Sequence, residues 1–458
     1  MAATFVVGPS GTAFAHASLR SSVPAANSVL EVGPAQIVLQ FSEPIEAGLA
    51  SIRLFAGNGH GVELGHPVGG TDDATVTATV PELPEDVYAV VWRVTSVDGH
   101  VVDGAFSFQV GTNATRNGQS LIAEVRRGVR AEPAVRWAYG IARFTAYLSV
   151  IALLGAGWWI LLGGALAPLA GRRWRRLPLV AAIALLLASL AAFACFGAEA
   201  VAGSLGDAFS PSVWADVAGT RTGALLLGRL GLAVAWIALV RIHRRLPKGS
   251  LNPVAFVMAL CTLYTFSAAG HPNTVRPAAL WIAVDLFHLA AITAWLGGLL
   301  ALALLPRAAL AEPDGELLAK RFSRVALLAV PVVVATGAAL GWKLNDGIDG
   351  ITDTEWGREV VTKLLLVAAL LAIAGISRFL LHRRSAPSMR YTVWGEAAIG
   401  LVVIGLAASI VSLPPEPPVK SQPYAEELAS TNGLIVSSAG RPARRDSTVI
   451  LSATMKPE

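Results

Sequence analysis

Cysteine and charged residues are both scarce in this chain of 458 residues. Its two cysteines, Cys195 and Cys261, lie inside apolar runs, so a framework of disulfides is excluded as a source of stability. Charged residues make up 15% of the chain and hydrophobic residues 54%, a balance that excludes an ordinary soluble protein. We therefore expect a multi-pass membrane protein whose parts outside the bilayer are stabilised by a packed core.

A continuous basic face of the kind that binds nucleic acid is also lacking. The formal net charge is +5, but the arginines stand in short clusters between apolar runs, which is the pattern of membrane topology. This distribution argues against nucleic acid as a partner and predicts contact with a lipid bilayer.

The first 15 residues lack lysine and arginine but otherwise have the features of a secretion signal. Small residues at Ala13 and Ala15 flank Phe14 immediately before His16, which is the pattern of a cleavage site. Because the segment is short and has no basic residue near its start, two explanations of this imperfect signal stay open. Either translation starts further upstream, or the segment remains attached as a tether.

Residues 16–112 alternate between short apolar strands and turns rich in Gly, Pro, Asp and Asn, which predicts an antiparallel β-sandwich or barrel. Residues 113–140 are more polar and rich in arginine, so we expect a linker there, with an amphipathic helix at the membrane surface over 121–130. The five expected strands are 36–41, 51–55, 75–80, 88–94 and 105–110.

Residues 141–413 contain about eight apolar runs long enough to cross a bilayer, since roughly 20 helical residues span its core of about 30 Å. An all-α membrane bundle is therefore expected to follow the β-domain, in a mixed multidomain protein. The expected spans are 142–163, 179–202, 224–240, 253–269, 279–305, 325–342, 360–381 and 392–413.

The loops after the first, third, fifth and seventh spans carry clusters of arginine and lysine, and the intervening loops are acidic or weakly charged. Positive loops stay in the cytoplasm, so both termini are expected outside a plasma membrane. A β-domain that follows a secretion signal requires the same orientation. The tail, 414–458, opens with a stiff proline-rich spacer and is expected outside the cytoplasm, with no assigned role.

Several potential metal ligands occur in the β-domain. Cleavage after Ala15 would make His16 the first residue, so that it offers both an α-amine and an imidazole nitrogen. Asp98 and His100 flank a glycine that permits a tight turn, and Glu43 is a further oxygen donor. Nitrogen and carboxylate ligands together favour Cu(II). An Asp-Gly-His turn alone is more often a solvated loop that needs no metal.

The order of these residues resembles CopC, the periplasmic copper-binding family. The resemblance is carried by 16–19 (HASL), 22–25 (SVPA), 41–44 (FSEP) and 92–108 (WRVTSVDGHVVDGAFSF). It implies a Greek-key fold of the cupredoxin type in which His16, Asp98 and His100 bind Cu(II), with Glu43 near the site.

The methionine-rich loop that gives some CopC proteins a Cu(I) site has no counterpart here. The four methionines are Met1, Met258, Met389 and Met455, all outside the mature β-domain. Because thioether sulfur is the soft ligand that Cu(I) prefers, we expect the domain to bind only Cu(II). His60 and His66 lie in a glycine-rich loop and are interpreted as solvated residues, with a weak extra site as the alternative.

Ionisable residues inside the expected spans are candidates for function, because charge is costly in hydrocarbon. Asp285 and His288 share a face of the fifth span, and His271 precedes that span on the outer side, so the three are expected to line an entry route for copper. A structural role for Asp285 and His288 is the alternative. The remaining polar residues are interpreted as paired charges or interfacial anchors (Glu199, Arg143, Arg229 and Lys363) or as small apolar residues (Cys195 and Cys261).

The membrane region resembles CopD, the inner-membrane partner of CopC. The resemblance rests on His288 and on the segments 295–298 (WLGG), 321–324 (RFSR), 336–337 (TG) and 357–365 (GREVVTKLL). These motifs are individually loose, but their order and their attachment to a CopC-like domain identify the whole as similar to a CopC-CopD fusion. The resemblance implies copper uptake or resistance.

The leading hypothesis is therefore a copper importer, not an enzyme, in which the β-domain captures Cu(II) and delivers it to the bundle. A haem protein that reduces copper is one alternative, although His288 is the only histidine well inside an expected span. A membrane-anchored store or sensor is another, and an oxidative enzyme with a copper-binding N-terminal histidine is a third. A copper chaperone as partner and the oligomeric state are left open by the sequence.

Overall fold

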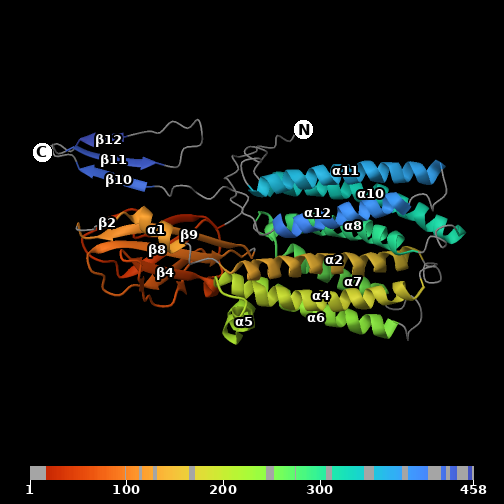
Figure 1. Ribbon diagram of the computed structural model, residues 1–458, viewed down its shortest axis with the longest axis horizontal. Helices are drawn as coiled ribbons and strands as arrows, with labels where there is room; N and C mark the ends of the chain where they lie inside the picture. Colours follow the sequence, from red (N-terminus) through yellow and green to blue (C-terminus); the bar gives the residue numbers. More distant parts are fainter. Residues whose placement is uncertain are drawn as a thin grey trace, which may run out of the picture. The chain divides into compact units, whose positions relative to one another are not determined.

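The computed structural model describes residues 17–97, 99–112, 116–126, 131–163, 171–243, 252–273, 275–305, 312–344, 355–383, 390–410, 424–429, 434–440 and 452–455 (Figure 1). The chain forms two compact units. One is β-rich and draws on His16–Val135 together with Phe196–Thr220, and the other is helical and draws on Arg136–Cys195 and Arg221–Pro415.

Two sheets form the β-domain. One has the strand order β1-β3-β7-β6 and the other the order β2-β9-β8-β4-β5. Successive strands such as β3 and β4, or β7 and β8, belong to different sheets, so the chain crosses repeatedly between them. The strands are β1 (Leu19–Val23), β2 (Val29–Leu30), β3 (Gln36–Phe41), β4 (Ser51–Ala56), β5 (Gly61–Val62), β6 (Val68–Gly69), β7 (Thr75–Thr79), β8 (Asp86–Thr95) and β9 (Val101–Val110).

The core of the β-domain follows from side-chain alternation along the strands. In β3, Ile37, Leu39 and Phe41 point inward and are at most 2% exposed, because every second residue of a strand faces the same side. They pack against residues of the other sheet, including Tyr88 and Phe108. The expected β-sandwich is thus confirmed, and its core replaces the disulfides that the sequence lacks.

Strand β8 is buried on both faces. Its even-numbered residues from Tyr88 to Val94 join the sandwich core. Val87, Ala89 and Val91 face the other way, against the helix α1 (Gly118–Val125), which covers them with Leu121, Ile122 and Val125. The apolar face that the sequence suggested for a membrane surface therefore packs on the sheet.

Seven helices in the described part of the chain are long and apolar enough to cross a membrane. The fourth expected span is shorter than the others: α7 (Asn252–Ser267) has 16 residues. The long helices are α2 (Pro133–Gly163), α4 (Gly171–Ala200), α6 (Arg221–His243), α8 (Ala278–Leu304), α10 (Pro313–Leu344), α11 (Glu355–Arg383) and α12 (Arg390–Ile410).

The outer faces of these helices are apolar, as a lipid environment requires. Phe287 on α8 is 66% exposed, Leu328 on α10 is 74% exposed, and Leu365 on α11 is 68% exposed. Inside the unit, α8 contacts α10, α12 and α7, and its residues Trp295 and Leu299 are almost fully buried. The chain is a multi-pass membrane protein with α8 near the centre of its helical unit.

A third sheet lies in the tail. Its strands β10 (Tyr424–Ala429), β11 (Leu434–Gly440) and β12 (Ser452–Met455) pair antiparallel in that order.

Helices α2 and α8 cross where two glycines meet. A Cβ atom added to Gly297 would lie 2.3 Å from the Cα of Gly155, and one added to Gly155 would lie 2.4 Å from the Cα of Gly297. Any side chain at either position would therefore collide with backbone, which cannot swing aside. The crossing depends on both glycines, as small residues commonly permit close approach of helices in membranes.

We expect Gly297→Ala to destabilise the helical unit by on the order of 1–3 kcal/mol, the usual penalty for overpacking. The measurement is the unfolding temperature of the purified protein in detergent. Gly228→Ala on α6 is the matched control, because a Cβ there meets nothing within 4 Å. Equal unfolding temperatures for the two variants would contradict the crossing.

Candidate metal centre

The turn between β8 and β9 carries the first group of expected ligands. The two strands pair up to Thr95 and Val101, and the Ser96 amide donates to the His100 carbonyl at 2.8 Å to close the turn. Gly99 has a φ of 84°, a left-handed conformation that glycine adopts without strain. The turn therefore needs its glycine, and it fixes the backbone at His100.

A second segment is attached to this turn. The Glu46 amide donates to the Thr95 carbonyl at 2.7 Å, and Ile45 forms an isolated β-bridge with Ser96. The Ser96 hydroxyl donates to Glu43 Oε1 at 3.1 Å. Glu43 is thereby held beside the turn that bears His100.

The first described residues of the β-domain reach the same place. Ser18 and Ser42 are joined twice, by Ser18 N to Ser42 Oγ at 2.9 Å and by Ser42 N to Ser18 O at 2.9 Å. Ala17 is 1% exposed, so the chain is buried up to the residue that follows His16.

Three segments that are distant in sequence thus converge at one end of the sandwich. His100 is buried, at 6% exposure, and Glu43 is half-buried. His16 and Asp98 lie outside the described residues. Within the described part of the chain, no group of three His, Cys, Asp or Glu side chains is placed to hold a metal. Of the four residues of the expected site, the structure describes His100 and Glu43.

The sandwich core supports the turn from beneath. Trp92 packs edge-on against Phe41, with ring centroids 5.2 Å apart. It also lies over Gly104, where an added Cβ would come within 2.3 Å of the indole ring. Because Phe41 and Trp92 each lie a few residues from a segment with expected ligands, their packing fixes the relative positions of those segments.

In the helical unit, the polar residues of α8 meet α10. The imidazole Nδ1 of His288 lies 2.9 Å from the hydroxyl of Thr336, and that hydroxyl donates its hydrogen to the Val332 carbonyl. In the tautomer that carries its proton on Nδ1, the ring donates to this hydroxyl and leaves the lone pair on Nε2, the form in which imidazole binds metals.

Space for the His288 ring depends on the next residue of α10. A Cβ added to Gly337 would lie 3.1 Å from Cε1 of the ring. The Thr336-Gly337 pair therefore supplies a hydrogen-bond partner and room for the ring together.

Two further polar groups lie near Asp285, one helical turn before His288. Lys363 on α11 interacts electrostatically with both Asp285 and His288. The buried hydroxyl of Ser267, at the end of α7, neighbours the Asp285 carboxyl. Lys363 is thus within electrostatic range of both residues of α8, so an acidic, an imidazole and a basic side chain share one region of the bundle.

His271 belongs to the short helix η4 (His271–Asn273), which contacts α8. It is half-buried. Asp285 lies seven residues beyond the first residue of α8, or about 10 Å along the helix axis. His271 is therefore associated with the same helix as the other two expected residues of the entry route.

Arg229, another charge inside the bundle, has structural partners. Arg229, 5% exposed, donates from Nη2 to the Thr265 carbonyl at 2.8 Å and from Nε to its hydroxyl at 3.1 Å. Its guanidinium also stacks on the Phe266 ring, 3.5 Å from the centroid. The interpretation of Arg229 as a partnered charge is supported by these contacts.

One buried carboxyl, that of Glu396, was not among the residues predicted from the sequence. Glu396 on α12 is 2% exposed and accepts a hydrogen bond from Ser377 on α11. The signal was present, since a glutamate within an apolar span is a functional candidate by default. Thr336 and Ser267 carried no such signal, because hydroxyls are common in membrane helices.

The family models that match the chain follow the boundaries of the fold. The CopC domain model matches residues 19–111, which hold β1 to β9. The model described as copper resistance protein D-like, N-terminal domain, matches 133–274, and that of copper resistance protein D matches 316–410.

Curated relatives match both the whole chain and its parts. Copper transport protein CutJ of Bacillus subtilis is 28% identical over 447 residues, covering 94% of this chain and 80% of CutJ. Protein YobA of Escherichia coli is 33% identical over 110 residues, 23% of this chain and 86% of YobA. Inner membrane protein YebZ of Escherichia coli is 27% identical over 289 residues, 60% of this chain and 97% of YebZ.

Proposed function

We propose that this chain captures Cu(II) with its β-domain and passes copper inward through its helical unit. The chain belongs to the copper resistance family of CopC and CopD proteins. Copper is the cargo of this protein, and CutJ, which is named a copper transport protein, has the same two parts in one chain. The β-domain serves capture and the helical unit serves passage.

The observation that carries the proposal is the convergence of segments 17–18, 42–46 and 96–100. It gathers His100 and Glu43 at one end of the sandwich, and Ser18, two residues after His16 in the sequence, is hydrogen-bonded to Ser42 at the same end. We assign His16, Asp98 and His100 as ligands, with Glu43 accepting hydrogen bonds at the rim of the site. Imidazole, amine and carboxylate donors together suit Cu(II).

Inside the bundle, we assign His288 Nε2 as the metal-binding atom. The Thr336 hydroxyl orients the ring through Nδ1, as outer-shell partners do for metal-binding histidines elsewhere. Asp285 supplies negative charge that offsets the loss of water around a cation in the bundle. Lys363 balances that carboxylate when copper is absent.

The charge of the loops supports the inward direction that we propose. Clusters of arginine and lysine between alternate spans belong in the cytoplasm, so the β-domain and its copper site face outward. Copper then enters past His271, at the outer end of α8, and moves along Asp285 and His288. A cleaved signal before His16 fits this orientation and frees the α-amine.

We expect proteoliposomes that contain the full-length protein to accumulate copper when Cu(II) is supplied outside. The measurement is internal copper by mass spectrometry after removal of external metal with a chelator, compared with protein-free liposomes. Copper bound in proportion to protein, with no time-dependent accumulation, would contradict transport and indicate a membrane-anchored store instead.

A further inference from the structure

Arg93 occupies the outer face of β8 beyond the end of α1. Val87, Ala89 and Val91 of this face contact α1, and Arg93 continues the same row because alternate residues of a strand share a face. It is nevertheless buried, at 5% exposure. A buried guanidinium is costly unless its charge and its N–H groups find partners.

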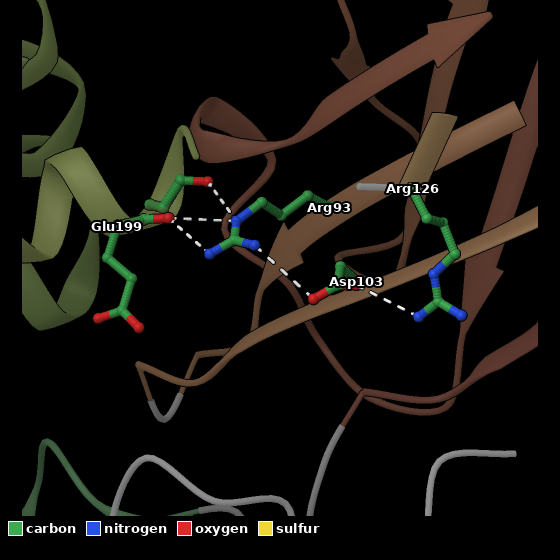
Figure 2. Close-up of polar contacts among 5 residues, drawn as sticks. Arg93, Asp103, Arg126 and Glu199 are labelled. Atoms are coloured by element: carbon green, nitrogen blue, oxygen red, sulfur yellow. Dashed lines mark hydrogen bonds and ion pairs between the residues drawn. The ribbon is translucent and has the colours of Figure 1, made fainter. Parts of the chain in front are cut away.

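The partners of Arg93 are backbone carbonyls from a distant part of the chain (Figure 2). Its Nε lies 3.1 Å from the carbonyl oxygens of both Glu199 and Ala200, and its Nη2 lies 2.7 Å from that of Glu199. These two residues are the last of α4. The contact lies inside the β-rich unit, which includes Phe196–Thr220 as well as the β-domain.

These carbonyls are suitable acceptors because of where they lie in the helix. The last four carbonyls of a helix have no partner within it, and they form the negative end of the helix dipole. A guanidinium offers several N–H donors in one plane together with a positive charge. Arg93 therefore caps α4, although the two lie 106 positions apart in the sequence.

Asp103 holds the guanidinium in this position. It is opposite Arg93 in the β8–β9 register, and its Oδ1 lies 3.7 Å from Arg93 Nη1. Arg126, which ends α1, places its Nη2 3.6 Å from the other carboxylate oxygen of Asp103. The row Arg93, Asp103, Arg126 thus alternates in charge along one face of the sheet (Figure 2).

Residues 196–220 are here called the α4–α6 connection. Besides Arg93, they contact Glu132 and the short helix η1 of the same unit. The Leu205 amide donates to Glu132 Oε2 at 3.3 Å, and the Glu132 amide donates to the Gly203 carbonyl at 3.2 Å. The helix α5 (Pro211–Ala218) contacts η1 (Ala47–Leu49), the short helix that follows the segment bearing Glu43.

The connection is itself well packed. α5 lies against Gly197, where an added Cβ would meet side-chain atoms of Val213 at 2.5 Å and Val217 at 2.8 Å. The Trp214 indole donates to the Ala208 carbonyl at 2.7 Å. The Ser204 amide and hydroxyl both donate to Asp207, and they lower the pKa of that carboxyl. A segment with this much internal structure can serve as a docking surface.

The contact points flank the expected copper site. Arg93 lies three residues before Ser96, the first residue of the β8–β9 turn, and η1 begins four residues after Glu43. We propose that the α4–α6 connection is a docking platform for the β-domain, anchored by Arg93, and that copper is transferred from this docked state. The docking stands on the contacts alone, whereas the transfer step rests on the proposed function.

The experiment is hydrogen exchange of the full-length protein in nanodiscs, read by mass spectrometry on peptides from 201–220. We expect Arg93→Ala to speed exchange there by about tenfold or more, because hydrogen bonds to a charged group are lost. Arg53→Ala is the matched control, since Arg53 is exposed on β4. Unchanged exchange in 201–220 for Arg93→Ala would overturn the proposal.

Two further variants separate docking from misfolding of the sheet. Glu132→Ala removes an anchor that lies outside the sheet and is expected to speed exchange in the same peptides to a lesser degree. Arg93→Lys keeps the positive charge but lacks the planar guanidinium with its several N–H donors. We expect it to retain part of the wild-type protection of 201–220 against hydrogen exchange. If neither variant shifts the exchange of 201–220 in its expected direction, docking by Arg93 is contradicted.

Transfer is tested with the same variants in proteoliposomes supplied with Cu(II). We expect Arg93→Ala to lower the rate of copper accumulation severalfold while the Cu(II) affinity of the β-domain stays at the wild-type value. Faster exchange with unchanged accumulation would overturn the transfer step. If the wild-type protein itself moved no copper, the proposed function would fail, and the exchange measurement would still decide the docking.

Discussion

Replacing His100 with alanine is expected to weaken Cu(II) binding by more than about 100-fold, since even the loss of an outer-shell partner lowers metal affinity by about 10–100-fold. The imidazole is buried on a turn whose backbone is fixed by Gly99 and by the Ser96 to His100 hydrogen bond. The measurement is a competition titration with a Cu(II) chelator of known affinity.

His60→Ala and His66→Ala are the matched controls for this titration. Both histidines belong to the same domain and are exposed, so we expect each variant to retain wild-type affinity. If His100→Ala instead bound Cu(II) within about threefold of the wild type, well below the effect of losing even an outer-shell partner, His100 would not be a ligand. Circular dichroism of the purified variants establishes that the fold is retained.

His288→Ala is expected to abolish copper accumulation in proteoliposomes while leaving the Cu(II) titration of the β-domain unchanged. An apolar side chain offers no ligand to a cation within the bundle, where the loss of water is costly. Phe287→Ala is the matched control, because Phe287 is the preceding residue on α8 and is 66% exposed. Accumulation at the wild-type rate by His288→Ala would exclude it from the route.

Thr336→Val tests the orientation of the His288 ring. Valine has nearly the shape of threonine but cannot form the hydrogen bond with Nδ1 of His288. The ring therefore loses the contact that fixes its orientation and the position of its proton. We expect a loss of accumulation of roughly 10–100-fold, the usual effect of removing an outer-shell partner. Thr336→Ser keeps the hydroxyl and is expected to restore most of the rate.

The fold of the β-domain could be predicted because its signals are local. Alternation in 36–41 and 88–94 placed β3 and β8 to within two residues. The partner of α1 could not be predicted. Leu121, Ile122 and Val125 form an apolar stripe that suits a lipid surface as well as a sheet, and only the tertiary structure distinguishes the two.

The helical unit was predictable in composition but not in detail. Seven long helices fit the expected spans, whereas α7 ends after 16 residues because its apolar run reaches Gly270 and Pro272 soon after Ser267.

The polar contacts depend on long-range packing. Asp285 and His288 were recognised from their spacing on one helix, but Lys363 and Thr336 come from other helices and needed the structure to be placed beside them. The same holds for Arg93, whose sequence neighbours give no indication that it caps a helix more than 100 positions away.

The crossing of α2 and α8 also limits how the bundle can move. At Gly155 and Gly297 the two backbones are in direct contact, so α8 cannot slide or bend at this point without striking α2. His288 lies nine residues earlier on the same helix, about 13 Å away along its axis. If copper passes His288 as proposed, we expect the opening to come from tilting of α10, which carries Thr336, and not from movement of α8 toward α2.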